Sequence, residues 1–283
     1  MNNQKRAFHF LLTPIGSSGD VHPFLGIGKE LLARGHDVTL LTGETFRETA
    51  ESLGMAFEPT WDGKSYEYIT NDSRLWKVTQ GLQLVLSTTA AGLEILYDLI
   101  ERHYQPSRTI LVGHTLSFAT RMFEEKHDAP AATVHLAPSA FRSDYAQSAV
   151  PPGIDISGLP RWLKRAMWRG LDHLIIDPSI APVMNAFRKR LGLKPVSRLF
   201  KEYLHSQRKV IGLFPEWFAP RQIDWPSQLD LTSFPLYDEG DLHALSDDLR
   251  AFLACGEAPI VCTAGTGNRQ AKKFFEKMIA AIT

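Results

Sequence analysis

The feature that most constrains the fold is an alternation of apolar runs and helical patterns at the start of the chain. Compact apolar runs lie at residues 7–13, 37–42 and 55–58. Between them, residues 22–33 and 45–53 carry apolar side chains at helical spacing, and each of these two segments is followed closely by glycine. Strands that are separated by helices of this length require a parallel sheet with right-handed crossovers. We therefore predict an α/β fold with a Rossmann-like parallel sheet.

The alternation resumes further along the chain. We expect a long helix that ends at His103 and a second helix over residues 117–127. Further strands are expected at residues 109–113, 131–136, 209–213 and 229–232, and helical structure over residues 151–194. These elements complete one domain, to which we assign residues 1–240.

Residues 241–283 are expected to form a linker and the start of a second domain. The segment 237–245 is polar and contains glycine, as is typical of a connection between domains. A strand at 259–263, the turn AGTG and a helix over 268–282 follow. Because one strand–helix unit cannot bury its own two faces, we interpret this end as a truncated second domain.

Composition excludes several classes of protein. The chain has 283 residues, 31 basic and 31 acidic side chains, so it lacks the basic excess expected of a nucleic-acid-binding protein. Its two cysteines, Cys255 and Cys262, favour a reduced, cytoplasmic environment. The N-terminal apolar run lacks a signal-peptide cleavage pattern, and residues 81–100 are interrupted by charges, so neither segment is predicted to be a leader or a membrane span.

The densest candidate site is the turn Gly16-Ser17-Ser18-Gly19-Asp20-Val21-His22-Pro23. It follows the first strand, and ligands of open α/β sheets bind at the carboxyl ends of strands. Its glycine spacing fits neither a dinucleotide fingerprint nor a phosphate loop, and the sequence has no D-x-D pair to hold a metal, which favours metal-independent chemistry. The plain alternative is a tight turn in which Asp20 or Ser18 only caps the helix.

The run GSSGDVHPFLGIGKELLARGHDVTLLT resembles the N-terminal domain of GT-B glycosyltransferases of the family 28 type, which are UDP-glycosyltransferase-like. Its branch includes bacterial rhamnosyltransferases, sterol glucosyltransferases and macrocycle-modifying enzymes. The later segments SRLWK, LFPEWFAPRQIDWPSQLDLTSFPLYD and PIVCTAGTG are similar to the rhamnosyltransferase subunits of rhamnolipid synthesis.

The resemblance implies transfer of a hexosyl group, rhamnosyl or glucosyl, from a nucleoside-diphosphate sugar such as a UDP- or TDP-sugar to an acceptor hydroxyl, with inversion. No other cofactor is implied. An acceptor alcohol is a poor nucleophile and needs a general base, and the position that matches the base of this family is Asp20. His114 matches, loosely, a residue that orients the base.

Five further positions complete the predicted site. Ser17, Ser18 and His22 are candidate acceptor-binding residues on the first turn, and His135 is another at the end of the fifth strand. At these four positions, a serine or histidine that only caps a helix, or whose hydrogen bonds are made within its own loop, is an equally good explanation. The loop Gly265-Thr266-Gly267 matches the donor-binding loop of the family, where backbone amides stabilise the departing diphosphate.

The segment LPRWLKRAMWRGLDHLI combines apolar residues at helical spacing with arginines and a lysine. We expect Trp162, Leu163 and Leu171 to face the sheet and the basic residues to face solvent. The alternative is a helix that accepts lipid or contacts the inner face of a membrane peripherally. We expect an aliphatic acceptor to lie between the sheet edge and the helices of residues 151–194.

Two other functions stay open at this level. A lone acceptor domain could act as a sugar- or lipid-binding module without catalysis, and a sugar-nucleotide epimerase can share the same fold. The epimerase would need a complete donor site and acidic residues in the cleft, whereas the transferase needs an apolar acceptor cavity. Because the rest of the donor site is absent, we expect the 283-residue chain alone to be inactive.

Overall fold

The structure is a computed structural model of the 283-residue chain. The residues that it describes are 7–62, 69–146, 155–240, 244–266 and 271–282. Their central feature is a seven-stranded parallel sheet with the strand order β3-β2-β1-β4-β5-β6-β7. The strands are β1 (His9–Thr13), β2 (Asp37–Gly43), β3 (Ala56–Trp61), β4 (Thr109–His114), β5 (Ala131–His135), β6 (Lys209–Gly212) and β7 (Leu229–Leu231).

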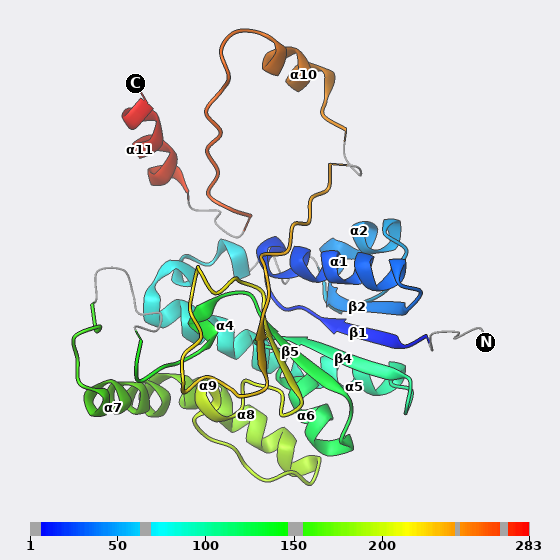
Figure 1. The fold of residues 1–283 in the computed structure, drawn as a ribbon, viewed down its shortest axis with the longest axis vertical. Coiled ribbons are helices and arrows are strands. Elements are labelled where there is room, and N and C mark those ends of the chain that lie inside the picture. The colour runs from blue at the N-terminus through cyan, green and yellow to red at the C-terminus, as the bar shows by residue number, and fades with distance from the viewer. Residues whose placement is uncertain (1–6, 63–68, 147–154, 241–243, 267–270, 283) are drawn as a thin grey trace.

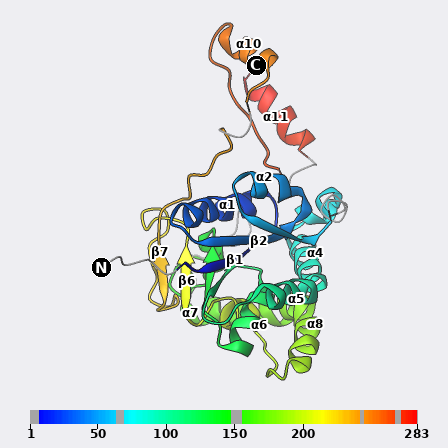
Figure 2. The ribbon, with the colours of Figure 1, turned by 90° about the vertical axis from the view of Figure 1, so that its right-hand side faces the viewer.

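Helices cover both faces of this sheet (Figures 1 and 2). The helices α1 and α2 pack on one face, against side chains such as Leu12 and Val38. The helices α4, α5, α6 and α8 pack on the other face, against Leu11 and Leu111.

The α-helices are α1 (Ser18–Ala33), α2 (Arg47–Ser52), α4 (Val78–Ala91), α5 (Leu93–His103), α6 (Phe118–His127), α7 (Arg161–Leu171), α8 (Asp177–Arg190), α9 (Leu199–Glu202), α10 (Asp247–Ala254) and α11 (Lys272–Ile282). Shorter helical turns are η1 (Glu44–Phe46), η2 (Ser73–Trp76), η3 (Pro138–Ala140) and the π-helical η4 (Asp172–Ile176).

The chain reverses its direction of travel across the sheet beside β1. It runs outward from β1 to β2 and β3, then returns to place β4 on the other side of β1. Such a switch point opens a crevice at the carboxyl ends of the two strands, because the loops that follow them diverge to opposite faces. The prediction of a Rossmann-like α/β sheet is confirmed, and the switch point lies where the turn at Gly16 leaves β1.

Two predicted helices differ from the observed ones. The first begins at Ser18 rather than at residue 22, so Asp20 lies within its first turn. The long helix predicted to end at His103 is two helices, because the chain breaks at Gly92 between α4 and α5. Glycine weakens a helix interior, and here it marks the bend between the two segments.

The part of the chain after the sheet differs most from expectation. Residues 259–263 do not form the predicted strand, and Ile260 and Val261 are 69% and 85% exposed. A strand needs a neighbouring strand to satisfy its backbone groups, and none lies beside this segment among the described residues. The helices α10 and α11 bury none of their described side chains and lie away from the sheet (Figures 1 and 2).

The faces of α7 are only partly those predicted: Leu171 packs against the core, but Trp162 and Lys164 are on the opposite sides from those expected. Trp162 is 69% exposed, whereas Lys164 and Trp168 are buried. The Lys164 ammonium donates a hydrogen bond of 3.1 Å to the carbonyl of Ser157, and Arg142 stacks on the Trp168 ring. The side of α7 that faces the core therefore meets a polar group, the Ser157 carbonyl. This carbonyl accounts for Lys164 rather than Trp162 facing inward.

Candidate active site

Asp20 is held over the first turn by the residues that precede it. Its Oδ2 accepts hydrogen bonds from the backbone N–H and the hydroxyl of Ser17, at 2.8 and 3.2 Å. Gly16 adopts φ +138°, and a Cβ at this position would lie 2.1 Å from Asp20 Oδ2. Only glycine allows the carboxylate to fold back over this turn. Asp20 therefore does cap the helix, but only through Oδ2. Its other carboxylate oxygen, Oδ1, takes no part in these hydrogen bonds.

The second oxygen of Asp20 faces His114 at the end of β4. His114 Nε2 lies 3.7 Å from Asp20 Oδ1. The backbone N–H of Leu116 donates to His114 Nδ1 at 3.4 Å, which assigns the ring proton to Nε2, on the side of Asp20. Burial lowers the pKa of His114 to about 4, with Asp20 opposing part of this shift. At neutral pH the ring is therefore uncharged and presents an N–H to the carboxylate.

Asp20 and His114 both line a cavity of about 760 Å³. Its other walls come from the end of β3, from η2, from α4 and α5, and from the start of α6. Most of these side chains are apolar, and they include Leu75, Trp76, Val85, Ile95, Leu96 and Phe118. An apolar chamber with a carboxylate and a neutral imidazole on its wall suits an amphiphilic ligand that carries a hydroxyl.

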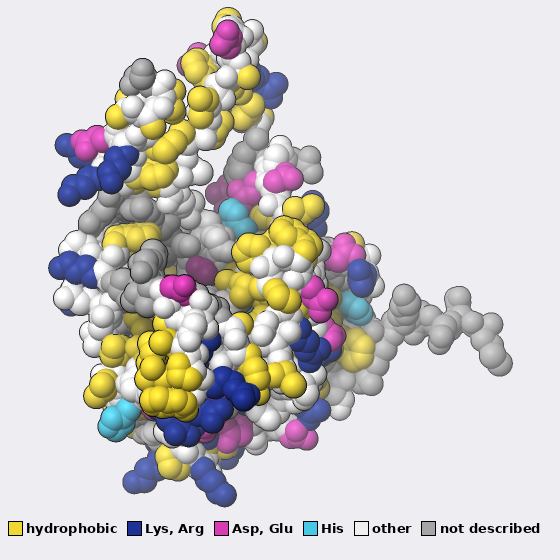
Figure 3. Space-filling view, turned by 60° about the vertical axis from the view of Figure 1, so that its left-hand side comes forward, with side chains coloured by type: hydrophobic (Ala, Val, Ile, Leu, Met, Phe, Trp, Pro, Cys, Tyr) yellow, Lys and Arg dark blue, Asp and Glu magenta, His cyan; other side chains and the backbone are white. Residues whose placement is uncertain are grey.

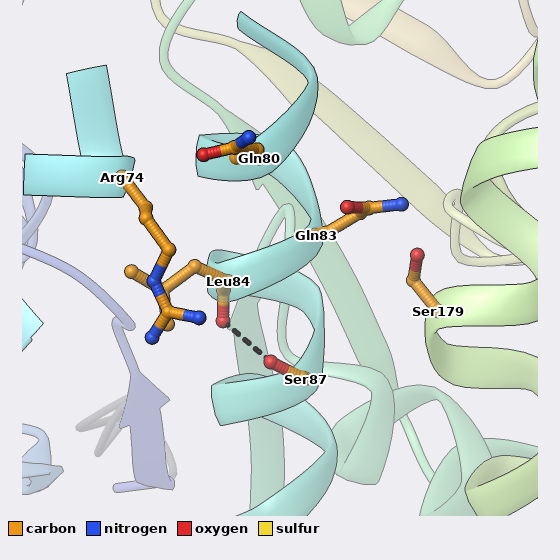
Figure 4. Close-up of a pocket in the computed structure, with 6 residues that line it drawn as sticks. All are labelled: Arg74, Gln80, Gln83, Leu84, Ser87 and Ser179. Carbon is orange, nitrogen blue, oxygen red and sulfur yellow. Dashed lines mark hydrogen bonds between the residues drawn. The ribbon is translucent and has the colours of Figure 1, made fainter. Parts of the chain in front are cut away.

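A second hollow, of about 500 Å³, lies between α4 and α8 and has a different character. Figure 4 shows Gln83 of α4 directed toward Ser179 of α8, with Arg74 of η2 on the other side. The Ser87 hydroxyl donates to the Leu84 carbonyl at 2.9 Å. Among the residues that the structure describes, no carboxylate or imidazole lines this hollow, so none of them could act as a base there.

The residues predicted on the first turn separate into two groups. Ser17 lines the cavity with Asp20. Ser18, the first residue of α1, is not among the cavity residues. His22 points elsewhere: its Nε2 lies 3.4 Å from Glu239, and its ring contacts Tyr237 edge-on at 5.6 Å between centroids. The structure thus joins α1 to the segment that follows β7 through His22, rather than directing this ring to the cavity.

His135 is fully buried and does not reach the cavity. Its two ring nitrogens hydrogen-bond to Thr115 Oγ1 and to His205 Nδ1, each at 2.9 Å. Burial lowers the pKa of His135 well below its usual value and that of His205 to about 4. The Phe141 ring stacks on His205 at 5.4 Å. These groups tie together the loops after β4 and β5, next to His114.

The predicted donor loop is only partly described. Gly265 has φ +79° and is exposed together with Thr266, whereas Gly267 lies outside the described residues. The backbone N–H of Gly265 donates to Thr263 Oγ1 at 3.3 Å, and a Cβ at Gly265 would meet nothing within 4 Å. The proposed role of these loop residues as donor ligands rests on the sequence.

Two parts of the site escaped sequence reasoning. The cavity lies against α4 and α5, and not against the helices of residues 151–194 as expected, because α4 packs between the cavity and α8. The buried chain through Thr115 and His205 was also missed. No local signal was available, because His205 precedes the sixth strand, and residues before a parallel strand are expected at the edge opposite its carboxyl end.

Comparisons with known proteins agree with this fold. Residues 10–100 match the family model described as Glycosyltransferase family 28 N-terminal domain. The solved structure of the glycotransferase of kitacinnamycin superposes with a TM-score of 0.59 at 14% identity, covering 85% of this chain and 55% of that one. The sheet domain therefore has the GT-B glycosyltransferase fold.

Two curated relatives make the likeness more specific. O-mycaminosyltylonolide 6-deoxyallosyltransferase of Streptomyces fradiae is 28% identical over 263 residues, which cover 90% of this chain and 60% of that protein. Sterol 3-beta-glucosyltransferase of Komagataella phaffii is 45% identical over 243 residues, or 84% of this chain and 19% of that protein. By sequence and fold the sheet domain is similar to part of these glycosyltransferases, and the chain spans less than two thirds of either relative.

Proposed function

We propose that this chain supplies the acceptor-binding half of an inverting glycosyltransferase. The reaction moves a hexosyl group from a nucleoside-diphosphate sugar to the hydroxyl of a lipid or other hydrophobic acceptor. The observation that carries this proposal is the apolar cavity of about 760 Å³ with Asp20 and His114 on its wall. The names of the Streptomyces and yeast relatives support the transferase class.

In this proposal Asp20 acts as the general base. Oδ2 is fixed by Ser17, so Oδ1 can accept the proton of an acceptor hydroxyl while the carboxylate keeps its position. The acceptor oxygen then attacks the anomeric carbon as the bond to the diphosphate breaks. The diphosphate leaves with the bonding electron pair, and the hydroxyl proton stays on Asp20.

His114 acts as a positioning residue for Asp20. A positively charged imidazolium would stabilise the carboxylate and weaken it as a base, whereas the neutral ring offers only an N–H at 3.7 Å. The ring is also held from behind by the Leu116 backbone and edge-on by Phe24. Its role is to limit the directions in which Oδ1 can turn.

The donor belongs to the second half of the enzyme in this proposal. Residues 1–240 form the acceptor domain, and residues 241–283 form the linker and the first part of a nucleotide-sugar-binding domain. Gly265, Thr266 and Gly267 are proposed to approach the diphosphate through backbone N–H groups. The sequence offers no D-x-D pair, so the proposed transfer is metal-independent. The rhamnosyl identity of the sugar rests only on the resemblance of the sequence.

The acceptor assignment is tested by calorimetric titration of this chain with hydroxy-fatty acids of increasing length. Each buried methylene contributes about 0.8 kcal/mol, so affinity should rise about fourfold for each added methylene until the cavity is filled. Glucose serves as the small polar comparison and should not bind measurably. Equal affinity for all chain lengths, or preference for glucose, would overturn the hydrophobic acceptor while leaving the transferase proposal intact.

A further inference from the structure

The cavity beside Asp20 contains a buried polar side chain that the proposed base chemistry does not use. Hydrophobic side chains gather at several places on the outside of the molecule as well (Figure 3), so apolar surface alone does not identify what a site binds. The cavity differs from those places because Thr60 is part of its wall. Thr60 lies near the end of β3 and is 6% exposed.

The Thr60 hydroxyl is buried and has no hydrogen-bond partner among the residues that the structure describes. Thr88, on another wall of the same cavity, differs in this respect, because its hydroxyl donates to the Leu84 carbonyl at 2.9 Å. A hydroxyl that is buried without a partner destabilises the protein. Rotation about the Cα–Cβ bond decides whether the hydroxyl or the methyl group of Thr60 faces the cavity. A polar atom of a ligand in the cavity could therefore supply the partner that the fold does not.

An irregularity in the pairing of β3 with β2 presents Thr60 to the cavity. The two strands pair in register up to Thr42 and Pro59. The register then shifts, so that Gly43 pairs with Trp61 and Thr60 is passed over. Successive residues of a regular strand point to opposite faces, so this bulge accounts for both Thr60 and Trp61 lining the cavity. The Trp61 indole lies against Gly43, where a Cβ would be 2.5 Å from Nε1, so a larger residue would displace this wall.

Thr60 and Asp20 lie at separate places on the cavity wall. Asp20 follows β1, whereas Thr60 lies near the end of β3, two strands away in the sheet. Neighbouring strands are about 4.8 Å apart, so the ends of β1 and β3 are about 10 Å apart. Apolar side chains of α4 and α5, such as Val85 and Leu96, form much of the remaining wall. The cavity therefore has two polar positions that an extended molecule could contact at the same time.

We propose that Thr60 hydrogen-bonds to a second polar group of the acceptor, a hydroxyl or a carbonyl about 10 Å from the hydroxyl that reacts at Asp20. The acceptor then has polar groups at both ends and an apolar middle that packs against α4 and α5. Thr60 selects this class of molecule over an alcohol with a single polar end. This inference rests on the proposed function, because it takes the cavity to be the acceptor site.

The test is calorimetric titration of this chain with 1,10-decanediol and with 1-decanol, which differ by one terminal hydroxyl. Thr60→Val keeps the shape of the side chain and removes its hydroxyl. It should lower the affinity for the diol about fivefold and leave the affinity for decanol unchanged or higher. Thr60→Ser keeps the hydroxyl and should keep the affinity for the diol. The matched control is Thr88→Val, which removes a hydroxyl already bonded within α4 and should change both affinities alike.

Urea denaturation of the chain without ligand gives a second, independent readout. Because Thr60→Val removes an unpaired buried hydroxyl, its unfolding midpoint should be higher than that of the unmodified chain. A lower midpoint would show that the protein itself satisfies this hydroxyl, and would overturn the inference. An equal effect of Thr60→Val on the diol and on decanol would also overturn it, while leaving the cavity as the acceptor site. If the unmodified chain bound neither ligand, the hydrophobic acceptor itself would be contradicted, and this inference with it.

Discussion

At the scale of single residues, the position of the Asp20 carboxylate depends on a neighbour that has no side chain. Gly16 leaves β1 with φ +138°, and the carboxylate lies where the Cβ of any other residue would be. Ser17 then fixes one oxygen, and the other faces His114 and the cavity. The same contacts that cap the helix therefore also aim the proposed base.

Gly16→Ala tests this arrangement. Alanine would combine an unfavourable φ with a clash against Asp20, so we expect the free energy of unfolding to fall by about 1–3 kcal/mol. The measurement is urea denaturation. Gly19→Ala is the matched control in the same turn, because its nearest neighbour would be 3.9 Å away and its stability should be unchanged or higher. Equal stability of both variants would show that the turn is not strained by a side chain at residue 16.

The residue pattern predicted part of this site and not the rest. The glycines and the acidic residue of the first turn are local features, so the sequence could indicate Asp20 and its position after β1. The interaction of Asp20 with His114 joins residues far apart in the chain, and it needed the register of β1 with β4 to be known. Nothing local distinguished His114, which faces the cavity, from the fully buried His135.

At the scale of elements, the break at Gly92 shapes the cavity wall. It allows α4 and α5 to meet at an angle, and side chains from both helices line the cavity. The sequence predicted the seven strands of the sheet well, because short apolar runs between helices have few alternatives in an α/β sheet, but the strand predicted at 259–263 does not form. It did not predict the cavity, since apolar residues that line a hollow have the same helical spacing as residues that fill a core. The exposed Trp162 was mispredicted because helical spacing alone does not tell which side of a helix faces the core.

Val85→Trp tests the assignment of the wall. Val85 of α4 lines the cavity, and an indole there would occupy part of the volume available to an acyl chain. We expect long hydroxy-fatty acids to lose at least about tenfold in affinity, because several methylenes worth about 0.8 kcal/mol each would be displaced, whereas the shortest ligands should lose less. Calorimetry measures both. Val183→Trp, at an exposed position of α8, is the control and should leave binding unchanged.

At the scale of the whole molecule, buried neutral histidines near the site make the free energy of unfolding depend on pH. Burial lowers the pKa of His114 and of His205 to about 4 each, and lowers that of His135 well below its usual value. These three rings lie at the carboxyl edge of the sheet, where β4, β5 and β6 meet the site. No helix built from the described residues is long and apolar enough to cross a membrane.

Stability should therefore fall as pH decreases from about 6.5 toward 4. In this window the unfolded histidines bind protons and the folded ones do not, so protonation favours unfolding. Each histidine contributes up to about 1.4 kcal/mol per pH unit to the slope. Urea denaturation at several pH values measures it, and His205→Gln should give a shallower slope. A stability that stayed constant between pH 6.5 and 4.5 would contradict the burial of these rings as neutral groups.

The central claim is that Asp20 takes the acceptor proton, and the most direct measurement of it is kcat for Asp20→Asn. The assay uses a protein that joins this chain to a nucleotide-sugar-binding half, with a hydroxy-fatty acid as acceptor. Asparagine can still accept the Ser17 hydrogen bonds, so folding and acceptor affinity should change little. We predict that kcat falls roughly 10² to 10⁴-fold, the usual contribution of a positioned base. A variant that retained near-normal kcat would show that Asp20 only caps α1.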